Sequence, residues 1–215
     1  GRSDYGEPRM HFEFRPIETG NGQPKAVKAY DEIRDAIITM KLLPGAALQE
    51  RDICAQLGIS RTPMREAVLR LAQEGLVNVI PSGGTFVNKI SVRGVIEGQI
   101  VREALEVQMV RLAARNYDPS HERAFDLLMF RQQDAGKRRD ADEAFAIDNE
   151  FHQLLCVVAG FPNIWQTIHS ATGQLDRVRR RAFPREGFFD EVVHEHLAIQ
   201  KTLAAHDEAQ AVALM

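Results

Sequence analysis

The chain has 215 residues, 44% of them hydrophobic, which is enough to bury a core in one large domain or two modest ones. No stretch approaches the roughly 20 consecutive apolar residues of a membrane helix, and the N-terminal segment lacks the apolar centre of a signal peptide. We therefore expect a cytoplasmic protein without a membrane partner. The two cysteines, Cys54 and Cys156, lie in segments of helical periodicity, which favours reduced buried thiols over a disulfide.

The net charge of −3 hides an uneven distribution along the chain. Residues 25–90 carry 9 Lys and Arg against 7 Asp and Glu, whereas residues 91–215 carry 15 against 19. The first part is therefore mildly basic and the second part acidic, so the overall acidity does not exclude a polyanionic partner for the first part.

Three helices are predicted in the first part from the spacing of apolar residues. The first ends near Lys41, ahead of the breaker pair Pro44-Gly45. The second, in ERDICAQLG, has Gly58 just past its end, where a left-handed residue is expected. The third begins in SRTPMREAV, where we expect the Ser60 side chain to cap the free amides of the first turn.

After these helices the apolar spacing changes to two, in LVNVI and TFVNKI around PSGG, which predicts a hairpin. From Ser91 on, the pattern is helical only, and it predicts helices over residues 94–116, 121–139, 141–159, 162–181 and 188–215. The fold predicted is mainly α, with an N-terminal winged helix-turn-helix over residues 24–90 and a C-terminal all-α helical bundle over residues 91–215. We expect residues 1–23 to be a flexible segment or a remnant left by cloning.

Two short helices joined by a glycine turn form a unit whose second helix enters the major groove of DNA. Arg61 and Arg65 lie four residues apart on the face of the third helix opposite its apolar stripe, and Ser60 and Thr62 add hydroxyl groups. These side chains are suited to base edges and phosphates. The alternative is that the two arginines are solvated charges on an ordinary helix.

Two further features support DNA binding by the same unit. Arg51, at the start of the preceding helix, is placed to reach a phosphate or a base edge. Gly83 and Gly84, at the predicted hairpin tip, allow bare backbone to approach the minor groove.

The run from AYDEIRDAII through LLPGAALQERDICAQLGISRTPMREAVLRLAQEG to SGGTFV resembles the DNA-binding domain of GntR-family bacterial regulators along nearly its full length. The resemblance implies DNA contacts from Arg51, Arg61, Thr62, Arg65 and the wing glycine near Gly83. Met40 stands where relatives often have glycine, close to the end of the first helix.

In the second part, VREALEVQMVRLAAR, DNEFHQLLCVVAG and HEHLAIQKTLAAHD resemble the FadR-like branch of that family, whose members carry an FCD ligand-binding domain. Asp148 and His152 are four residues apart, so they leave one helix face and suit either a shared metal ion or a simple surface pair. The resemblance implies that both are metal ligands and that His196 is the third. His194 points elsewhere on its helix.

Imidazole and carboxylate ligands together suit Zn²⁺, Ni²⁺, Mn²⁺ or Fe²⁺. Relatives usually place a further histidine near the end of the final helix, and this sequence offers none before Met215. Because AQAVALM stops without any capping signal, we expect that the natural protein continues or that its tail was lost.

Arg102 matches the arginine that relatives direct into the same cavity. Its planar guanidinium suits a carboxylate, which points to a small organic acid as effector, whereas the alternative is an ion pair with Glu106 along the helix. The basic run RVRRR at residues 177–181 offers an effector contact from one of its members or forms a solvated face.

Together these features predict a homodimeric transcriptional repressor that binds a palindromic operator and is controlled by a carboxylate effector bound in a metal-containing helical domain. One alternative is a metal-dependent hydrolase that uses Asp148, His152 and His196 around an activated water. The glutamate of zinc-protease helix motifs is missing, however, because Glu150 leaves a different face. A second alternative is a DNA-binding scaffold without an effector.

Overall fold

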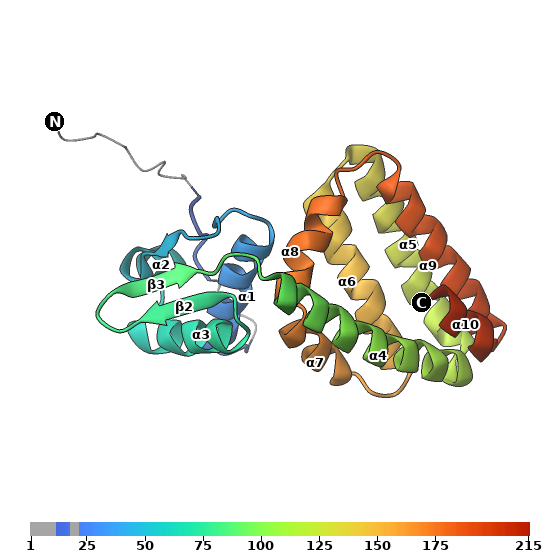
Figure 1. Cartoon of the computed structure of the whole chain (residues 1–215). Coiled ribbons are helices and arrows are strands. Elements are labelled where there is room, and N and C mark those ends of the chain that lie inside the picture. Colours follow the sequence, from blue (N-terminus) through green and yellow to red (C-terminus); the bar gives the residue numbers. More distant parts are fainter. Residues whose placement is uncertain (1–11, 18–21) are drawn as a thin grey trace. The chain divides into compact units, whose positions relative to one another are not determined.

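The protein is described by a computed structural model over residues 12–17 and 22–215, and it divides between Ile90 and Ser91 into two compact units (Figure 1). The first unit contains α1 (Lys25–Ile38), β1 (Ala47–Leu48), α2 (Glu50–Leu57), α3 (Arg61–Gln73), β2 (Val77–Ile80) and β3 (Gly84–Val87). The second unit contains α4 (Val92–Asn116), the short 3₁₀ helix η1 (Pro119–His121), α5 (Glu122–Arg138), α6 (Ala141–Val158), α7 (Ile164–Ala171), α8 (Gly173–Ala182), α9 (Phe188–Ala204) and α10 (Glu208–Leu214).

This architecture confirms the predicted fold class, a winged helix-turn-helix followed by an all-helical bundle. In the described ranges, no helix combines the length and the apolar character that crossing a membrane requires.

Helix α1 supports α3 from behind through apolar packing and one buried polar cluster. Ile33 and Ile37 of α1 and Leu71 of α3 are completely buried, and burying each such side chain stabilises the fold by about 1.5–3 kcal/mol. The Tyr30 hydroxyl donates to the carboxylate of Glu74 at 2.8 Å, just past the end of α3. These contacts fix the direction in which α3 presents its opposite face.

The turn between α2 and α3 follows the glycine expected there. Gly58 has φ +67°, a left-handed conformation that an L side chain adopts only with strain, and the Ile59 amide donates to the Cys54 carbonyl at 3.0 Å. Ser60 occupies the N-cap position of α3, but its side chain makes no capping hydrogen bond, so that part of the prediction is wrong. Its hydroxyl is therefore exposed at the start of α3.

The end of α1 places Met40 in a left-handed conformation, which would suit a glycine. The helix ends at Ile38, slightly earlier than expected, and Met40 has φ +62°. A left-handed conformation costs a non-glycine residue about 1–2 kcal/mol. The amide of Leu42 compensates in part by donating to the Ala36 carbonyl at 2.8 Å.

The wing is a three-stranded antiparallel sheet with strand order β1-β3-β2. Strands β2 and β3 form the predicted hairpin, with Val79 opposite Thr85 and Ile80 opposite Gly84. Strand β1 was not predicted, because two residues are too few to show alternation. It pairs Ala47 with Phe86 and thereby joins the wing to the segment that precedes α2.

Residues 12–17, which fall within the segment expected to be flexible, pack on the first unit. Phe14 is buried, and its amide donates to the side-chain oxygen of Gln56 at 2.7 Å. The Ile17 amide donates to the Leu57 carbonyl at 3.0 Å. Residues 1–11 and 18–21 of the same segment lie outside the described part of the chain.

The second unit is a bundle in which α4, α5, α6, α8 and α9 surround one interior. Two predicted helices are each broken into two. The break in the helix expected over 162–181 falls at Thr172, and the break in the helix expected over 188–215 follows Ala204, where His206 has φ +54°. Gly98 of α4 lies so close to the first break that a Cβ would be 3.2 Å from the Ala171 carbonyl oxygen. Because of this break, α8 begins in contact with α4.

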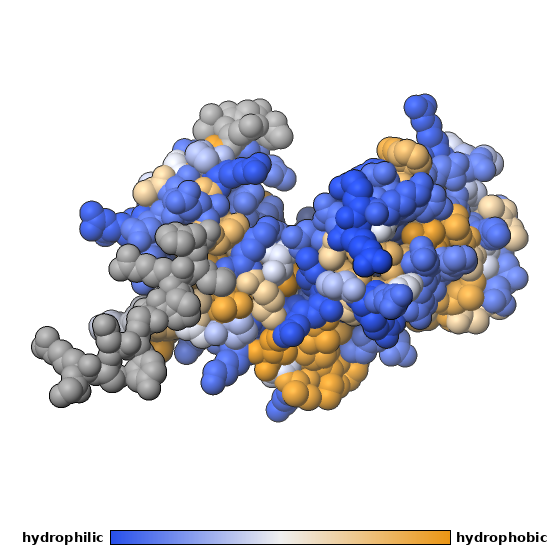
Figure 2. All heavy atoms as spheres, turned by 90° about the horizontal axis from the view of Figure 1, so that it is seen from above, coloured by the Kyte–Doolittle hydropathy of each residue, from blue (hydrophilic) through white to orange (hydrophobic). Residues whose placement is uncertain are grey.

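One face of α4 carries large apolar side chains in contact with solvent. Val92, Ile96 and Ile100 follow one another at intervals of four residues and are 75%, 54% and 61% exposed. Figure 2 shows a broad apolar area along the edge that faces the viewer in Figure 1, where α4 runs. Contiguous exposed apolar surface of this kind is typical of a protein contact.

Candidate functional site

Helix α3 presents the predicted polar residues to solvent. Arg61, Thr62 and Arg65 are exposed, whereas Met64, on the opposite face of the helix, is buried. Ser60 is exposed directly before the helix begins. Because α1 holds the buried face, these four side chains share one free surface at the N-terminal end of α3, the end that enters a major groove in helix-turn-helix proteins.

Arg51 lies exposed at the start of α2, and its neighbour Glu50 is tied to the wing. The Thr85 hydroxyl of β3 donates to the Glu50 carboxylate at 2.6 Å, and Thr85 is only 3% exposed. This bond fixes the wing strand against the first helix of the helix-turn-helix. The local sequence around Glu50 gives no sign of this hydrogen bond, because its partner Thr85 lies 35 residues further along the chain.

The tip of the wing requires both of its glycines. A Cβ at Gly83 would lie 2.7 Å from the Ile80 side chain, and Gly84 has φ +105°. Both residues are exposed. The tip is therefore a narrow loop of bare backbone, a shape that suits close approach to a groove.

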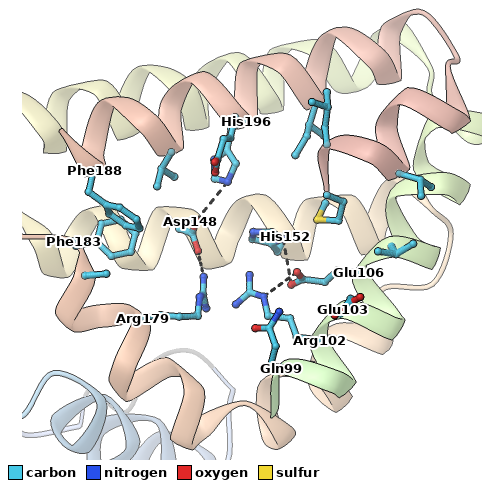
Figure 3. A pocket seen from close by; sticks show the side chains of 18 residues that line it. Gln99, Arg102, Glu103, Glu106, Asp148, His152, Arg179, Phe183, Phe188 and His196 are labelled. Atoms are coloured by element: carbon cyan, nitrogen blue, oxygen red, sulfur yellow. Dashed lines mark hydrogen bonds and ion pairs between the residues drawn. The ribbon is translucent and has the colours of Figure 1, made fainter. Parts of the chain in front are cut away.

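A cavity of about 470 Å³ lies inside the helical unit (Figure 3). One wall is polar and comes from α4, α6, α8 and α9. Another wall is apolar and includes Phe183, Phe188, Val192 and Ile199. The charged and other polar side chains that line the cavity are Gln99, Arg102, Glu103, Glu106, Asp148, His152, Arg179, Glu195 and His196.

The structure brings the three predicted metal ligands together. Asp148 and His152 lie one turn apart on α6, and His196 faces them from α9. One ligand atom from each lies within 4.8 Å of the others, and all three residues are buried. His194 is exposed and its Nδ1 contacts the Asp190 carbonyl oxygen at 2.7 Å, so it points away from the cluster.

These residues fit a divalent metal ion by their chemistry as well as by their spacing. Burial, aided by the nearby Arg102 and His196, lowers the pKa of His152 well below its usual value. Burial likewise lowers the pKa of His196 to about 4, although Asp148 opposes the shift. Both imidazoles are therefore neutral near pH 7, which is the form that binds a metal.

Arg102 of α4 reaches the same cavity and also makes the ion pair named as the alternative. Its Nε donates to Glu106 at 2.8 Å, and both side chains are more than nine-tenths buried. Burial raises the pKa of the Glu106 carboxyl group, against the opposing effect of Arg102. No described residue hydrogen-bonds to the two Nη groups of Arg102. These groups are consequently available to a ligand in the cavity.

Within the basic run at residues 177–181, Arg179 is the member that lines the cavity. Its guanidinium pairs with Asp148 and, at 2.9 Å, with Asp176 of its own helix. Burial disfavours the charged form of Arg179, but these carboxylates and Glu106 outweigh that effect and raise its pKa. Sequence reasoning could indicate the run but not which member lines the cavity, because that choice depends on where α8 begins.

Comparisons with known proteins agree with both units. Residues 25–87 match the family described as "Bacterial regulatory proteins, gntR family", and residues 99–215 match the FCD domain. The chain is 36% identical to an HTH-type transcriptional regulator in an unstable DNA locus of Streptomyces ambofaciens, over 87% of this chain and 75% of that protein. It is 32% identical to the HTH-type transcriptional repressor RspR of Escherichia coli (strain K12), over 86% and 81%.

Among solved structures, Escherichia coli McbR/YncC has the same fold, with a TM-score of 0.79 at 21% identity over 89% of this chain and 92% of that one. A GntR regulator from Rhodococcus sp. RHA1 superposes with a TM-score of 0.69 at 26% identity, over 88% and 91%. The family is one of transcriptional regulators and not of enzymes, which decides against the hydrolase alternative. The chain belongs to the GntR family of bacterial DNA-binding transcriptional regulators, in the FadR-like branch whose C-terminal domain is an FCD domain.

Proposed function

We propose that the protein is a repressor that binds a palindromic operator as a homodimer and releases it when a small carboxylate enters a metal-containing cavity. The observation that carries this proposal is the buried cluster of Asp148, His152 and His196 beside two arginines. A relative of similar length is named as a repressor, which favours repression as the output. A coupling of about 1–3 kcal/mol between the effector and DNA changes operator affinity roughly 5- to 150-fold.

The DNA contacts proposed are Arg51, Ser60, Arg61, Thr62, Arg65, Gly83 and Gly84. The exposure of α3 supports this assignment, because Arg61 and Arg65 lie free on the surface that faces away from α1. A guanidinium recognises guanine through two parallel hydrogen bonds in the major groove, while backbone amides and hydroxyls hold phosphates.

Replacing Arg65 with Ala should weaken operator binding by about 1–3 kcal/mol and relax base preference at one position of each half-site. The operator is first selected from random duplexes with the wild-type protein, and affinities are then measured by fluorescence anisotropy at fixed salt. Arg123→Ala removes the same charge from an exposed position on α5 and should change little. Equal affinities for the wild type and Arg65→Ala would remove Arg65 from the recognition surface.

Asp148, His152 and His196 would hold a Zn²⁺, Ni²⁺, Mn²⁺ or Fe²⁺ ion in this proposal. Such an ion supplies a fixed positive charge and open coordination positions for the oxygens of an effector. Arg102 and Arg179 pair with three carboxylates, those of Glu106, Asp148 and Asp176, so this cluster carries one net negative charge, and a divalent ion would leave it with one net positive charge. A positive interior, surrounded by low dielectric, favours an anion.

We expect the wild-type protein to bind one divalent ion per chain. His196→Ala should lose most of that affinity, because it removes one of the three proposed ligands from the site. Titration of metal-free protein against a chromophoric chelator measures both the number of ions bound per chain and their affinity. His194→Ala is the matched control, because His194 lies two residues away on the same helix but is exposed. Equal losses in the two variants would contradict the assignment.

The effector is proposed to be a small carboxylate bound by Arg102. The two Nη groups of Arg102 present parallel donors to the cavity while Nε stays with Glu106, and a carboxylate accepts two parallel hydrogen bonds. The apolar wall around Phe183 and Phe188 would contact the rest of the molecule.

A panel of small carboxylic acids should therefore contain members that raise the melting temperature of the metal-loaded protein. A ligand at 100 times its Kd stabilises a protein by about 2.7 kcal/mol. Arg102→Lys keeps the charge but not the paired donors, and it should abolish most of this gain. If no acid shifts the melting temperature or releases the operator, the scaffold without an effector becomes the better description.

The homodimer is proposed to form through the apolar face of α4 made by Val92, Ile96 and Ile100. A two-fold operator is read by two copies of α3, which a protein dimer presents in matching orientation. A second copy would cover the exposed α4 side chains with the same side chains of its own, as a two-fold interface requires.

Ile96→Asp should convert the dimer to a monomer, because a charge at the centre of an apolar interface is desolvated without a partner. Size-exclusion chromatography with light scattering measures the mass. Leu127→Asp is the control, since Leu127 is similarly exposed on α5. A dimer that survives Ile96→Asp would place the interface elsewhere.

A further inference from the structure

Two buried side chains lie directly behind the imidazoles of the cluster formed by Asp148, His152 and His196. Neither was identified from the sequence as part of the site. Gln132 comes from α5 and Glu106 from α4, so they reach the cluster from two helices that supply none of its three ligands. Gln132 is 1% exposed and Glu106 is 6% exposed, so both side chains are shielded from solvent where they face the rings.

Gln132 fixes the ring of His196. Its side-chain oxygen Oε1 lies 2.8 Å from Nδ1 of His196, and an amide oxygen can only accept. Nδ1 therefore carries the proton, and Nε2 is left as the basic nitrogen. Nε2 faces Asp148, whose Oδ1 lies 3.5 Å away. Phe151 stacks on the same ring at 3.8 Å between centroids and restricts its rotation.

Glu106 is placed in the same way behind His152. Its Oε1 lies 3.2 Å from Nδ1 of His152, and its other oxygen accepts a hydrogen bond from Nε of Arg102 at 2.8 Å. These two atoms are close but not aligned as in a hydrogen bond. Among the described residues, both Oε1 of Glu106 and Nδ1 of His152 therefore lack a hydrogen-bond partner. Figure 3 shows Glu106 between Arg102 and His152.

The two contacts have one chemical consequence. A neutral imidazole has one protonated nitrogen, and the partner of one nitrogen decides which of the two is free to bind a metal. An acceptor that hydrogen-bonds to the proton of Nδ1 leaves Nε2 free; Gln132 does this for His196, and Glu106 is the acceptor nearest to Nδ1 of His152. A carboxylate behind the ring would also make Nε2 a stronger metal ligand. Asp148 completes the pattern, because its Oδ2 pairs with Arg179 while Oδ1 faces His196.

We propose that Glu106 and Gln132 are positioning residues that select the Nδ1–H tautomer of His152 and His196, so that both Nε2 atoms point to one metal site. This inference rests on the metal site of the proposed function. Glu106 also contacts Arg102, so a single carboxylate links the arginine assigned to the effector with a ligand assigned to the metal.

Glu106→Gln tests the proposal. In this variant the one side-chain oxygen is taken by the Nε–H of Arg102, and the new NH₂ group faces Nδ1 of His152. The tautomer of His152 should therefore change to Nε2–H. Long-range ¹H–¹⁵N spectra of the metal-free protein report which ring nitrogen carries the proton, and a His152→Ala spectrum assigns the signals.

The same variant should bind Zn²⁺ about 10- to 100-fold more weakly, the usual effect of removing an outer-shell partner. Glu103→Gln is the matched control, because it removes the same charge from an exposed carboxylate of α4 that also lines the cavity. It should leave the His152 tautomer unchanged and Zn²⁺ affinity within about threefold, since exposed charges contribute little. Circular dichroism melting of metal-free protein checks the fold.

Gln132→Leu provides a second test if Glu106→Gln does not fold, because it removes the acceptor behind His196 and should give that ring a mixture of tautomers. An unchanged His152 tautomer in Glu106→Gln, or equal losses of Zn²⁺ affinity in Glu106→Gln and Glu103→Gln, would overturn the proposal. If the wild type binds Zn²⁺ and Glu106→Gln keeps the wild-type affinity and tautomer, this inference is wrong but the proposed function stands. A wild-type protein that binds no metal contradicts the proposed function itself.

Discussion

The helical unit depends on one constraint, which is that charges buried in its interior must be paired. Arg102, Glu106, Asp148 and Arg179 all reach a cavity whose surroundings exclude most water. An isolated buried charge is very costly, and a paired one is tolerated only with good geometry. The bundle meets this requirement with one pair within α4 and one between α6 and α8. The second pair ties the positions of α6 and α8 to the electrostatics of the cavity.

In the proposed function, this constraint would connect the packing of the helices with regulation. A ligand that adds or removes charge in the cavity changes which pairs are satisfied, and side chains from α4, α6, α8 and α9 must respond together. Helix α4 follows the junction between the two units directly, since it begins at Val92. A change in the environment of Arg102 or Glu106 therefore acts on the helix that leaves the DNA-binding unit.

The DNA-binding unit is held together by hydrogen bonds between elements that are distant in the sequence. Tyr30 and Glu74 join α1 to the end of α3, and Thr85 and Glu50 join the wing to α2. Both bonds span more than 30 residues of sequence and hold the recognition surface from behind.

The sequence by itself determined the fold class, the two-part organisation and most of the candidate site residues. Helical and strand periodicities are local, and so is the spacing of Asp148 and His152 on one helix face. His196 could be added only through a resemblance to a family. Local patterns also indicated the glycine turn at Gly58, because its left-handed conformation depends on neighbouring residues alone.

Only the tertiary structure decided which side chains surround that cluster. Arg179 is the member of its basic run that lines the cavity, because α8 begins after a break at Thr172. Glu106 and Gln132 lie beside the two histidines because α4 and α5 pack beside α6 and α9. These contacts join residues 31 to 64 positions apart, and periodicity within one helix carries no information about the register between helices. Two of the three proposed ligands were therefore accessible from local sequence spacing, whereas the groups proposed to orient them were not.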